Sequence, residues 1–488
     1  MALFLAVGIL RAWHHEPWRD ECGVWLLAHN CHSLGDLLPN LRYGGHPYLW
    51  PILAWLLAHA TTQIFFLQLL HLLPATVAVY LVLRYAPWPR WEAALCVLGY
   101  FFFFEYAVVC RAYGIALLGA VLVAIAWQKR ADRSLPGGAG LFLLTQSSVY
   151  GIILALAFIP LLGAIAWQRT RDRTLTGIWC AGWALPLLLG TALAVTMIVP
   201  PADSGFAPGW FVTFDRAHLA DVVAICWRAL VPIPDVNTPF PWNSNIADGF
   251  SLRVRAALGG FALGTALWCL RRNYLACLYF LLAALGLFAF SYFKLHGYLR
   301  HHGHLYLALF VAVWLTSTRM RPGFSHRAVC IRRGLFVTQA VAGIWLGTAD
   351  WVKPFSANRL AAEWIAAGDF GDYILAGCEA HPASGVGMYL QRPIYYLGSQ
   401  RWGTFIVWDN HDQPFSRAAE MFRSAAEFGE YNAQPVLLIL NHEFPEQEGF
   451  RLEASFTDSL IADERFFLYT REPQGDDRII ETGSFLDF

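Results

Sequence analysis

Two adjacent carboxylates, Asp20 and Glu21, follow the first apolar run of the chain in the stretch WRDECGVW. Partial desolvation at a membrane surface makes a carboxylate a better proton acceptor, which suits a general base. The alternative is structural, because Asp is favoured at the N-cap and Glu in the first turn of a helix such as ECGVWLLAHN. The two interpretations are compatible, and both residues are therefore candidate catalytic residues.

The turn KLHGYLRHHGH at 294–304 contains one guanidinium, one ammonium and four imidazole groups. Phosphate is the natural ligand of such a turn, and a guanidinium group can donate two parallel hydrogen bonds to it. A divalent metal is the alternative, since His301 and His304 have a usable ligand spacing on a helix, although no HExxH-type signature accompanies them. The sequence leaves metal binding open and indicates no other cofactor. The predicted phosphate ligands of this turn are Lys294, Arg300, His301 and His302.

Other polar residues stand near the ends of apolar runs. Arg111 in VVCRAYGIALL is an ionisable residue at the end of a predicted span, where a functional role is the default hypothesis. The alternative is that its side chain reaches the lipid headgroups. We add Arg111 to the phosphate-binding candidates, and His46, Glu105 and Tyr113 as candidate substrate-binding residues.

The composition indicates a membrane protein. Of 488 residues, 57% are hydrophobic and 14% charged, and the mean hydropathy is +0.43. The net charge of zero excludes nucleic acid as an expected partner, because binding to a phosphate backbone needs a surplus of basic residues. The sequence has no GxSxG, P-loop, CxxC or dinucleotide-binding motif, so hydrolase, ATPase and redox functions have no support from motifs.

Apolar runs long enough to span a bilayer, allowing for tilt, recur through the first 350 residues. Together with a short N-terminal run, they predict a mainly α-helical, polytopic membrane domain of about eleven spans over residues 1–350. The stretch 139–168 fits either two short spans or one long span with a re-entrant turn, and two spans are expected because only then do the five basic turns fall on the same side. The predicted spans after the first are 63–84, 91–109, 112–128, 139–151, 152–168, 176–199, 255–270, 274–293, 304–319 and 334–350.

The distribution of Lys and Arg predicts the orientation. Short basic turns at 84–90, 128–133, 168–173, 271–273 and 317–333 are expected on the cytoplasmic side. The first long loop, 14–62, a Pro-rich loop, 200–253, and the turn 294–304 then face the exported side. The apolar stretch 46–60 is interrupted by prolines and is expected to lie as an interfacial helix in the outer leaflet. This layout predicts a multi-pass protein of a cell membrane, most simply a bacterial inner membrane.

From residue 351 the composition becomes more polar, and spanning runs stop. Strand-like runs alternate with helix-like runs, which predicts a soluble extracytoplasmic α/β domain over 351–488. The expected strands are YILAG, PIYYLG, TFIVWD, PVLLIL and FFLYTRE, and the expected helices are ANRLAAEWIAAG and FSRAAEMFRSAAEFGEY.

Three motifs, in order, resemble the GT-C membrane glycosyltransferases of the protein O-mannosyltransferase and lipid A aminoarabinose transferase kind. WRDECGVWLLAHN resembles the acidic motif of their first exported loop, GGHPYLWPIL their interfacial helix, and VVCRAYGIALL the arginine after their third span. The resemblance covers about the first 130 residues. The later spans agree only in number and layout, and the C-terminal domain hardly at all.

This resemblance implies transfer of a sugar from a polyprenyl-phosphate donor to a lipid, glycan or protein acceptor on the exported side, usually with inversion. It assigns Asp20 as the base and Glu21 as its support, with the phosphate held by Arg111, Arg300 and one of His301 or His302. The expected partners are the lipid-linked donor, the acceptor and membrane lipid.

Two other classes of function remain as alternatives at this stage. A transporter or flippase of lipid-linked saccharides also needs apolar spans with cationic pockets, but it tends to have ionisable residues at the midplane and repeated halves. A non-catalytic scaffold would present the exported domain to a partner. Separation of Asp20 from Arg111 and Arg300 in the fold would favour the scaffold.

Overall fold

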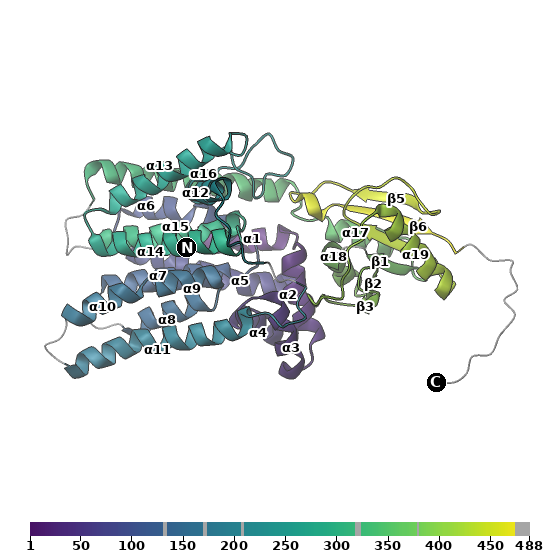
Figure 1. The fold of residues 1–488 in the computed structure, drawn as a ribbon, viewed down its shortest axis with the longest axis horizontal. Coiled ribbons are helices and arrows are strands. Elements are labelled where there is room, and N and C mark those ends of the chain that lie inside the picture. The colour runs from purple at the N-terminus through teal and green to yellow at the C-terminus, as the bar shows by residue number, and fades with distance from the viewer. Residues whose placement is uncertain (130–133, 169–172, 206–208, 318–323, 378–379, 474–488) are drawn as a thin grey trace, which may run out of the picture.

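The computed structural model consists of a helical body and a smaller α/β domain at one end of it (Figure 1). It describes residues 1–129, 134–168, 173–205, 209–317, 324–377 and 380–473. The predicted basic turns at 128–133, 168–173 and 317–333 lie partly outside these residues. The mainly α-helical class and the C-terminal α/β unit predicted from the sequence are confirmed.

Within the described residues, four helices are long and apolar enough to cross a membrane, which supports a membrane location. Other helices lie at the remaining predicted spans, but several are shorter, so the number of about eleven crossings stays a prediction. The four are α5 (Ile64–Tyr85), residues 177–198 of α11 (Arg173–Ile198), α14 (Tyr274–Phe293) and α16 (His326–Val352). The others are α1 (Ala2–His14), α7 (Tyr113–Gln128), α8 (Ser134–Thr145), α9 (Val149–Leu156), α10 (Ile159–Gln168), α13 (Leu252–Leu270) and α15 (Leu299–Thr316).

The predicted run 91–109 does not form one continuous α-helix. It forms α6 (Arg90–Val97) and then a short π-helix, η2 (Phe101–Glu105). Gly343 of α16 lies directly against the backbone of residues 98–100, and a side chain at this position would collide with that backbone. The break in the helix therefore coincides with a close approach of α16 that hydropathy alone does not reveal.

The first long loop is mostly helical. It contains α2 (Arg19–Asn30), α3 (Leu34–Leu41), the short 3-10 helix η1 (Arg42–Gly44) and α4 (Leu49–Ala58). The α4 helix falls within the predicted stretch 46–60, and its interfacial position stays a prediction. A helix that the sequence analysis missed, α12 (Arg216–Leu230), lies in the loop 200–253, and Asp215 caps it by accepting from the amides of residues 217 and 218.

The C-terminal domain is a mixed six-stranded sheet with helices on both faces. Alternate strand residues pack against α17 (Asn358–Ala367) and α18 (Ala380–Leu390) on one face and against α19 (Ala418–Asn432) on the other. The strand order is β3 (Arg401–Gly403), β2 (Ile394–Tyr396), β1 (Ile374–Gly377), β4 (Val436–Leu440), β6 (Phe466–Arg471) and β5 (Arg451–Phe456).

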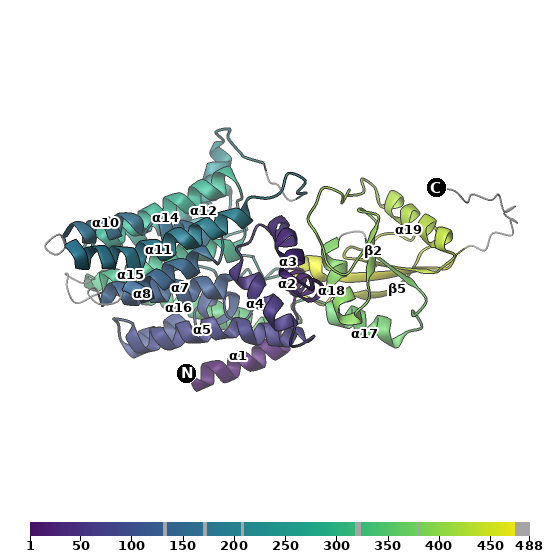
Figure 2. The same cartoon turned by 90° about the horizontal axis from the view of Figure 1, so that it is seen from below.

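Four of the five predicted strands and both predicted helices of this domain are confirmed. The expected strand TFIVWD at 404–409 is wrong, because the chain pairs through β3 just before it and then leaves the sheet. The edge strands β3 and β5 and the helix α18 were not predicted. In the three-dimensional arrangement, α18 packs against α2 of the helical body, and both lie where the two parts meet (Figure 2).

Candidate functional site

Asp20 lies between two guanidinium groups that come from distant parts of the chain. Its carboxylate forms an ion pair with Arg111, which directly precedes α7, and lies 3.6 Å from the Nη2 atom of Arg300 on α15. Arg111 in turn donates a hydrogen bond of 3.1 Å to Nε2 of His46, which precedes α4. The fold thus brings together four of the residues selected from the sequence.

The start of α2 determines where Asp20 lies. Trp18 is the N-cap, and the carboxylate of Glu21, the third residue of the helix, accepts a hydrogen bond of 3.1 Å from the Trp18 amide. Glu21 is completely buried and also accepts from the amide of Cys110, beside Arg111. Its carboxylate therefore joins the helix that carries Asp20 to the segment that carries Arg111. In this geometry Glu21 is a helix cap and a cross-link, with Asp20 the more accessible acid.

Arg300 is surrounded by aromatic rings. Its guanidinium carbon lies 4.7 Å from the ring centre of Tyr298, 5.1 Å from Trp18 and 5.5 Å from Trp242. Cation–π attraction and the limited space fix the direction of the side chain. Its Nε atom is buried and has no hydrogen-bond partner among the described residues.

Glu105 contacts Trp242, one of the three aromatic residues around Arg300. It is fully buried and accepts hydrogen bonds from Tyr100 (2.5 Å) and from the indole of Trp242 (3.1 Å). These contacts favour a supporting role for Glu105 over the direct substrate contact expected from the sequence.

The close packing of α15 in this region needs a glycine, because a side chain at Gly303 would collide with Phe101 and with the Tyr106 hydroxyl. The same Tyr106 hydroxyl donates to the Arg300 carbonyl at 2.6 Å.

The protonation of the site favours anion binding by arginine. Burial lowers the pKa of Arg111, but the Asp20 carboxylate outweighs this effect and raises the pKa above its ordinary value. The Arg111 side chain therefore stays cationic. Burial, and next the positive charge of Arg111, lower the pKa of His46 to about 4. His46 is therefore neutral near pH 7 and acts as a hydrogen-bond acceptor that orients Arg111.

The three histidines of α15 all make hydrogen bonds to protein groups. His301 accepts from the Tyr298 amide at 2.9 Å, and so caps α15. His302 donates through Nε2 to the His296 carbonyl at 3.1 Å, which leaves Nδ1 as an acceptor unsuited to phosphate. Both nitrogens of His304 are within 3.3 Å of protein groups, the His301 carbonyl and the Ser148 hydroxyl.

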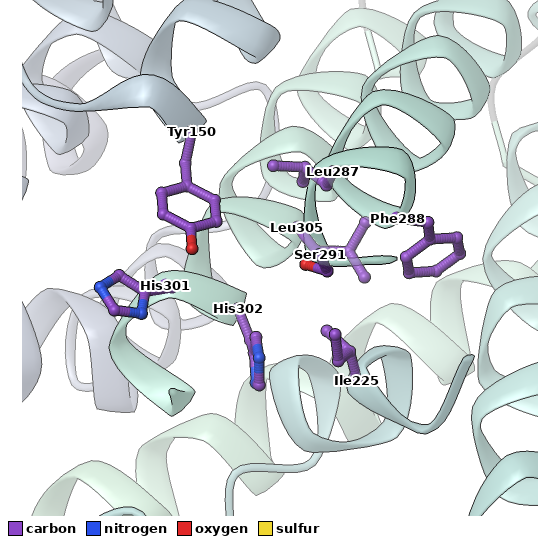
Figure 3. Close-up of a pocket in the computed structure, with 8 residues that line it drawn as sticks. All are labelled: Tyr150, Ile225, Leu287, Phe288, Ser291, His301, His302 and Leu305. Atoms are coloured by element: carbon purple, nitrogen blue, oxygen red, sulfur yellow. The ribbon is translucent and has the colours of Figure 1, made fainter. Parts of the chain in front are cut away.

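His301 and His302 instead line a small cavity beside Tyr150 (Figure 3). The remaining lining residues are largely apolar, and the volume is about 10 Å³, enough for a single water. Across the described ranges, no group of three or more His, Cys, Asp or Glu side chains has an arrangement that could hold a metal ion. The pair His301 and His304 therefore gains no support as a metal site from the geometry.

The two other candidates, Lys294 and Tyr113, contact aromatic rings. The Lys294 ammonium, at the end of α14, lies 4.9 Å from the ring centre of Trp210. The Tyr113 ring begins α7 and contacts His301 and His304 edge to face, with centres 6.0 and 5.5 Å apart. Neither contact shows a direct role in binding a substrate.

A buried charged trio behind the site was missed from the sequence. His15 contacts Glu21 at 3.2 Å through Nε2 and Asp350 of α16 at 3.0 Å through Nδ1, and all three side chains are buried. Burial acts against a charged imidazole, but Asp350 and Glu21 outweigh it and raise the pKa of His15 to about 10. The trio ties the ends of α1 and α16 to the start of α2. Only the histidine's position directly after the first apolar run hinted at such a role.

Comparisons with known proteins give distant structural likenesses but no match in sequence. No protein-family profile and no curated protein sequence matches this chain. Among solved structures, the chain is similar to ArnT from Cupriavidus metallidurans in the apo state, with 14% sequence identity and a TM-score of 0.42, over 96% of this chain and 97% of that chain. ArnT is a lipid A aminoarabinose transferase of GT-C type, the kind of protein that the sequence motifs resemble. At this identity and score, the likeness by itself supports no conclusion about activity.

Proposed function

We propose that this protein is an integral membrane glycosyltransferase that moves a sugar from a polyprenyl-phosphate donor to an acceptor on the exported side. The observation that carries the proposal is the meeting of Asp20, Arg111 and Arg300, which are far apart in the sequence. One carboxylate beside two guanidiniums supplies a proton acceptor and a site for a leaving phosphate. This contact also favours an enzyme over a non-catalytic scaffold.

In the proposed reaction, the acceptor hydroxyl oxygen forms a bond to the anomeric carbon while the bond from that carbon to the phosphate oxygen breaks. The electron pair of the broken bond stays on the polyprenyl phosphate, and the hydroxyl proton passes to Asp20. Attack opposite the leaving phosphate inverts the anomeric centre. Arg111 and Arg300 stabilise the charge that develops on the phosphate.

The ion pairs of Asp20 support a competition between the carboxylate and the donor phosphate. Without donor, the Asp20 carboxylate is the anion that the two guanidiniums hold. A bound phosphate offers them more oxygen acceptors, so it draws at least one guanidinium away from Asp20. Asp20 is then less neutralised and better able to accept a proton. Donor binding and activation of the base are coupled in this scheme.

The test is incubation of purified protein with a radiolabelled polyprenyl-phosphate sugar and an extract of lipid, glycan and protein acceptors. We expect the wild type to release polyprenyl phosphate and to label an acceptor, and Asp20→Asn to lose this activity. Asp458→Asn is the matched control, since Asp458 is a largely exposed acid of the C-terminal domain paired with Lys353. Absence of sugar transfer and of donor hydrolysis by the wild type would contradict the proposal.

A further inference from the structure

The helix that carries Asp20 is capped by the C-terminal domain. The first amides of a helix lack partners within the helix and need an acceptor from elsewhere. The Arg19 amide, at the first position of α2, donates to Glu464 at 3.2 Å, across 445 positions of sequence. Glu464 lies in the short 3-10 helix η3 (Ala462–Glu464) and is completely buried.

Further contacts hold the same turn. Asn358, at the start of α17, donates to the Pro17 carbonyl at 3.0 Å, and Asp463 forms an ion pair of 3.1 Å with the Arg19 side chain. Glu464 is itself fixed by the Ser356 hydroxyl, which donates to it at 2.7 Å. Residues 17–19 are thus held by three side chains that all lie beyond α16.

Both neighbours of Asp20 in the sequence are therefore held in place by hydrogen bonds. The preceding residue, Arg19, is held by the C-terminal domain, whereas the following residue, Glu21, is held by His15 and the Cys110 amide of the helical body. The Asp20 carboxylate must meet guanidiniums from two other elements. A displacement of about 1 Å at such a centre is enough to lower a rate by about 10²-fold.

We propose that Glu464 is a positioning residue for the transfer reaction, through which the C-terminal domain sets the first turn of α2 and hence the placement of Asp20. This inference rests on the proposed function for its catalytic consequence. It assigns the C-terminal domain a part in building the active site, so that transfer requires this domain to be docked on α2.

The variants Glu464→Ala and Glu464→Gln test this inference in the full-length protein. Burial raises the pKa of Glu464 to about 8. Glutamine keeps one acceptor oxygen for the Arg19 amide, and its NH2 group can donate to the Ser356 hydroxyl, which is also able to accept. We expect Glu464→Ala to lower kcat about tenfold, the scale of losing one helix cap, with the KM for donor within about twofold of wild type. Glu464→Gln should restore kcat, and the control Asp458→Asn should match the wild type.

Hydrogen exchange of the amides at 19–22 gives a readout that needs no activity. We expect faster exchange there in Glu464→Ala, wild-type exchange in Glu464→Gln, and no difference in the distant strands β1 and β4. If Glu464→Ala does not fold, Glu464→Asp replaces it, because the shorter side chain keeps the acid but not the reach to the Arg19 amide.

The outcomes separate this inference from the proposed function. Unchanged exchange at 19–22 in Glu464→Ala, or an equal loss of kcat in Glu464→Gln, would overturn the positioning role. A wild type that transfers no sugar, together with faster exchange in Glu464→Ala, would refute the proposed function while supporting the control of α2 by Glu464. A lowered Tm with unchanged kcat and exchange would mean that Glu464 is only structural, and would also overturn the inference.

Discussion

The adjacent acids Asp20 and Glu21 should respond to neutralisation in opposite ways. Asp20→Asn keeps the shape of the side chain and an acceptor oxygen for Arg111 and Arg300, so we expect a Tm close to that of the wild type. If Asp20 is the general base, the loss of proton transfer lowers kcat by roughly 10²- to 10⁴-fold. The donor should still bind, because both guanidiniums remain.

Glu21→Gln should chiefly reduce stability. The Glu21 carboxylate accepts from the amides of Trp18 and Cys110 and from His15, all buried. An amide group has one acceptor oxygen, so at least one buried donor must face the NH2 group, at a cost of about 1–3 kcal/mol. The loss of negative charge beside the charged His15 adds to this, and we expect a total of about 3 kcal/mol.

The assay pairs two measurements on each variant in detergent. Thermal unfolding followed by tryptophan fluorescence gives Tm, and transfer from a radiolabelled polyprenyl-phosphate sugar gives kcat at a temperature where both variants are folded. Wild-type turnover by Asp20→Asn would refute the assignment of the base. A loss of 10²-fold or more in Glu21→Gln with an unchanged Tm would show that the roles of the two acids are reversed.

Three further predictions follow from the surroundings of the site. Arg300→Lys keeps the charge but loses the forked contact and the stacking on Trp18, so we expect the KM for donor to rise about tenfold, and an unchanged KM would contradict its role. Glu105→Gln should leave that KM within about twofold of wild type, since Glu105 is buried behind Trp242; a large increase would restore it as a substrate-binding residue. The raised pKa of His15, about 10 against an ordinary 6.5, means that its contribution to stability is complete below pH 6.5 and lost as the pH rises through 10. Between pH 6.5 and 10 the Tm of the wild type should fall, and that of His15→Gln should fall less. Equal decreases in Tm with pH for the two proteins would exclude a contribution of charged His15 to stability.

Much of the architecture could be predicted because it depends on local pattern. Apolar runs located the helices of the body, and alternating apolar residues located most strands of the C-terminal domain. The failures have a common cause. The break at residues 98–100 coincides with the close approach of Gly343 from a distant helix, and the short edge strands β3 and β5 form by pairing with β2 and β6. These are tertiary contacts that the local sequence does not encode.

For the site, the sequence by itself determined the types of group and their place at the ends of apolar runs. It selected Asp20, Arg111, Arg300 and His46, because ionisable residues beside apolar segments are costly unless they have a function. Only the tertiary structure decided between neighbours of like chemistry. Glu21 became a buried cap because the amides of Trp18 and Cys110 converge on it, while Asp20, one residue away, points to the two guanidiniums.

The histidines of α15 and the aromatic residues show the same division. His301, His302 and His304 looked equivalent in the sequence, but each is oriented by a different hydrogen-bond partner in the folded protein. Trp242 and Glu464 carried no local signal, since their roles come from contacts with segments more than a hundred residues away. Hydropathy and side-chain chemistry are properties of the chain, whereas the direction of a buried polar group is set by the partner that satisfies it in the folded protein.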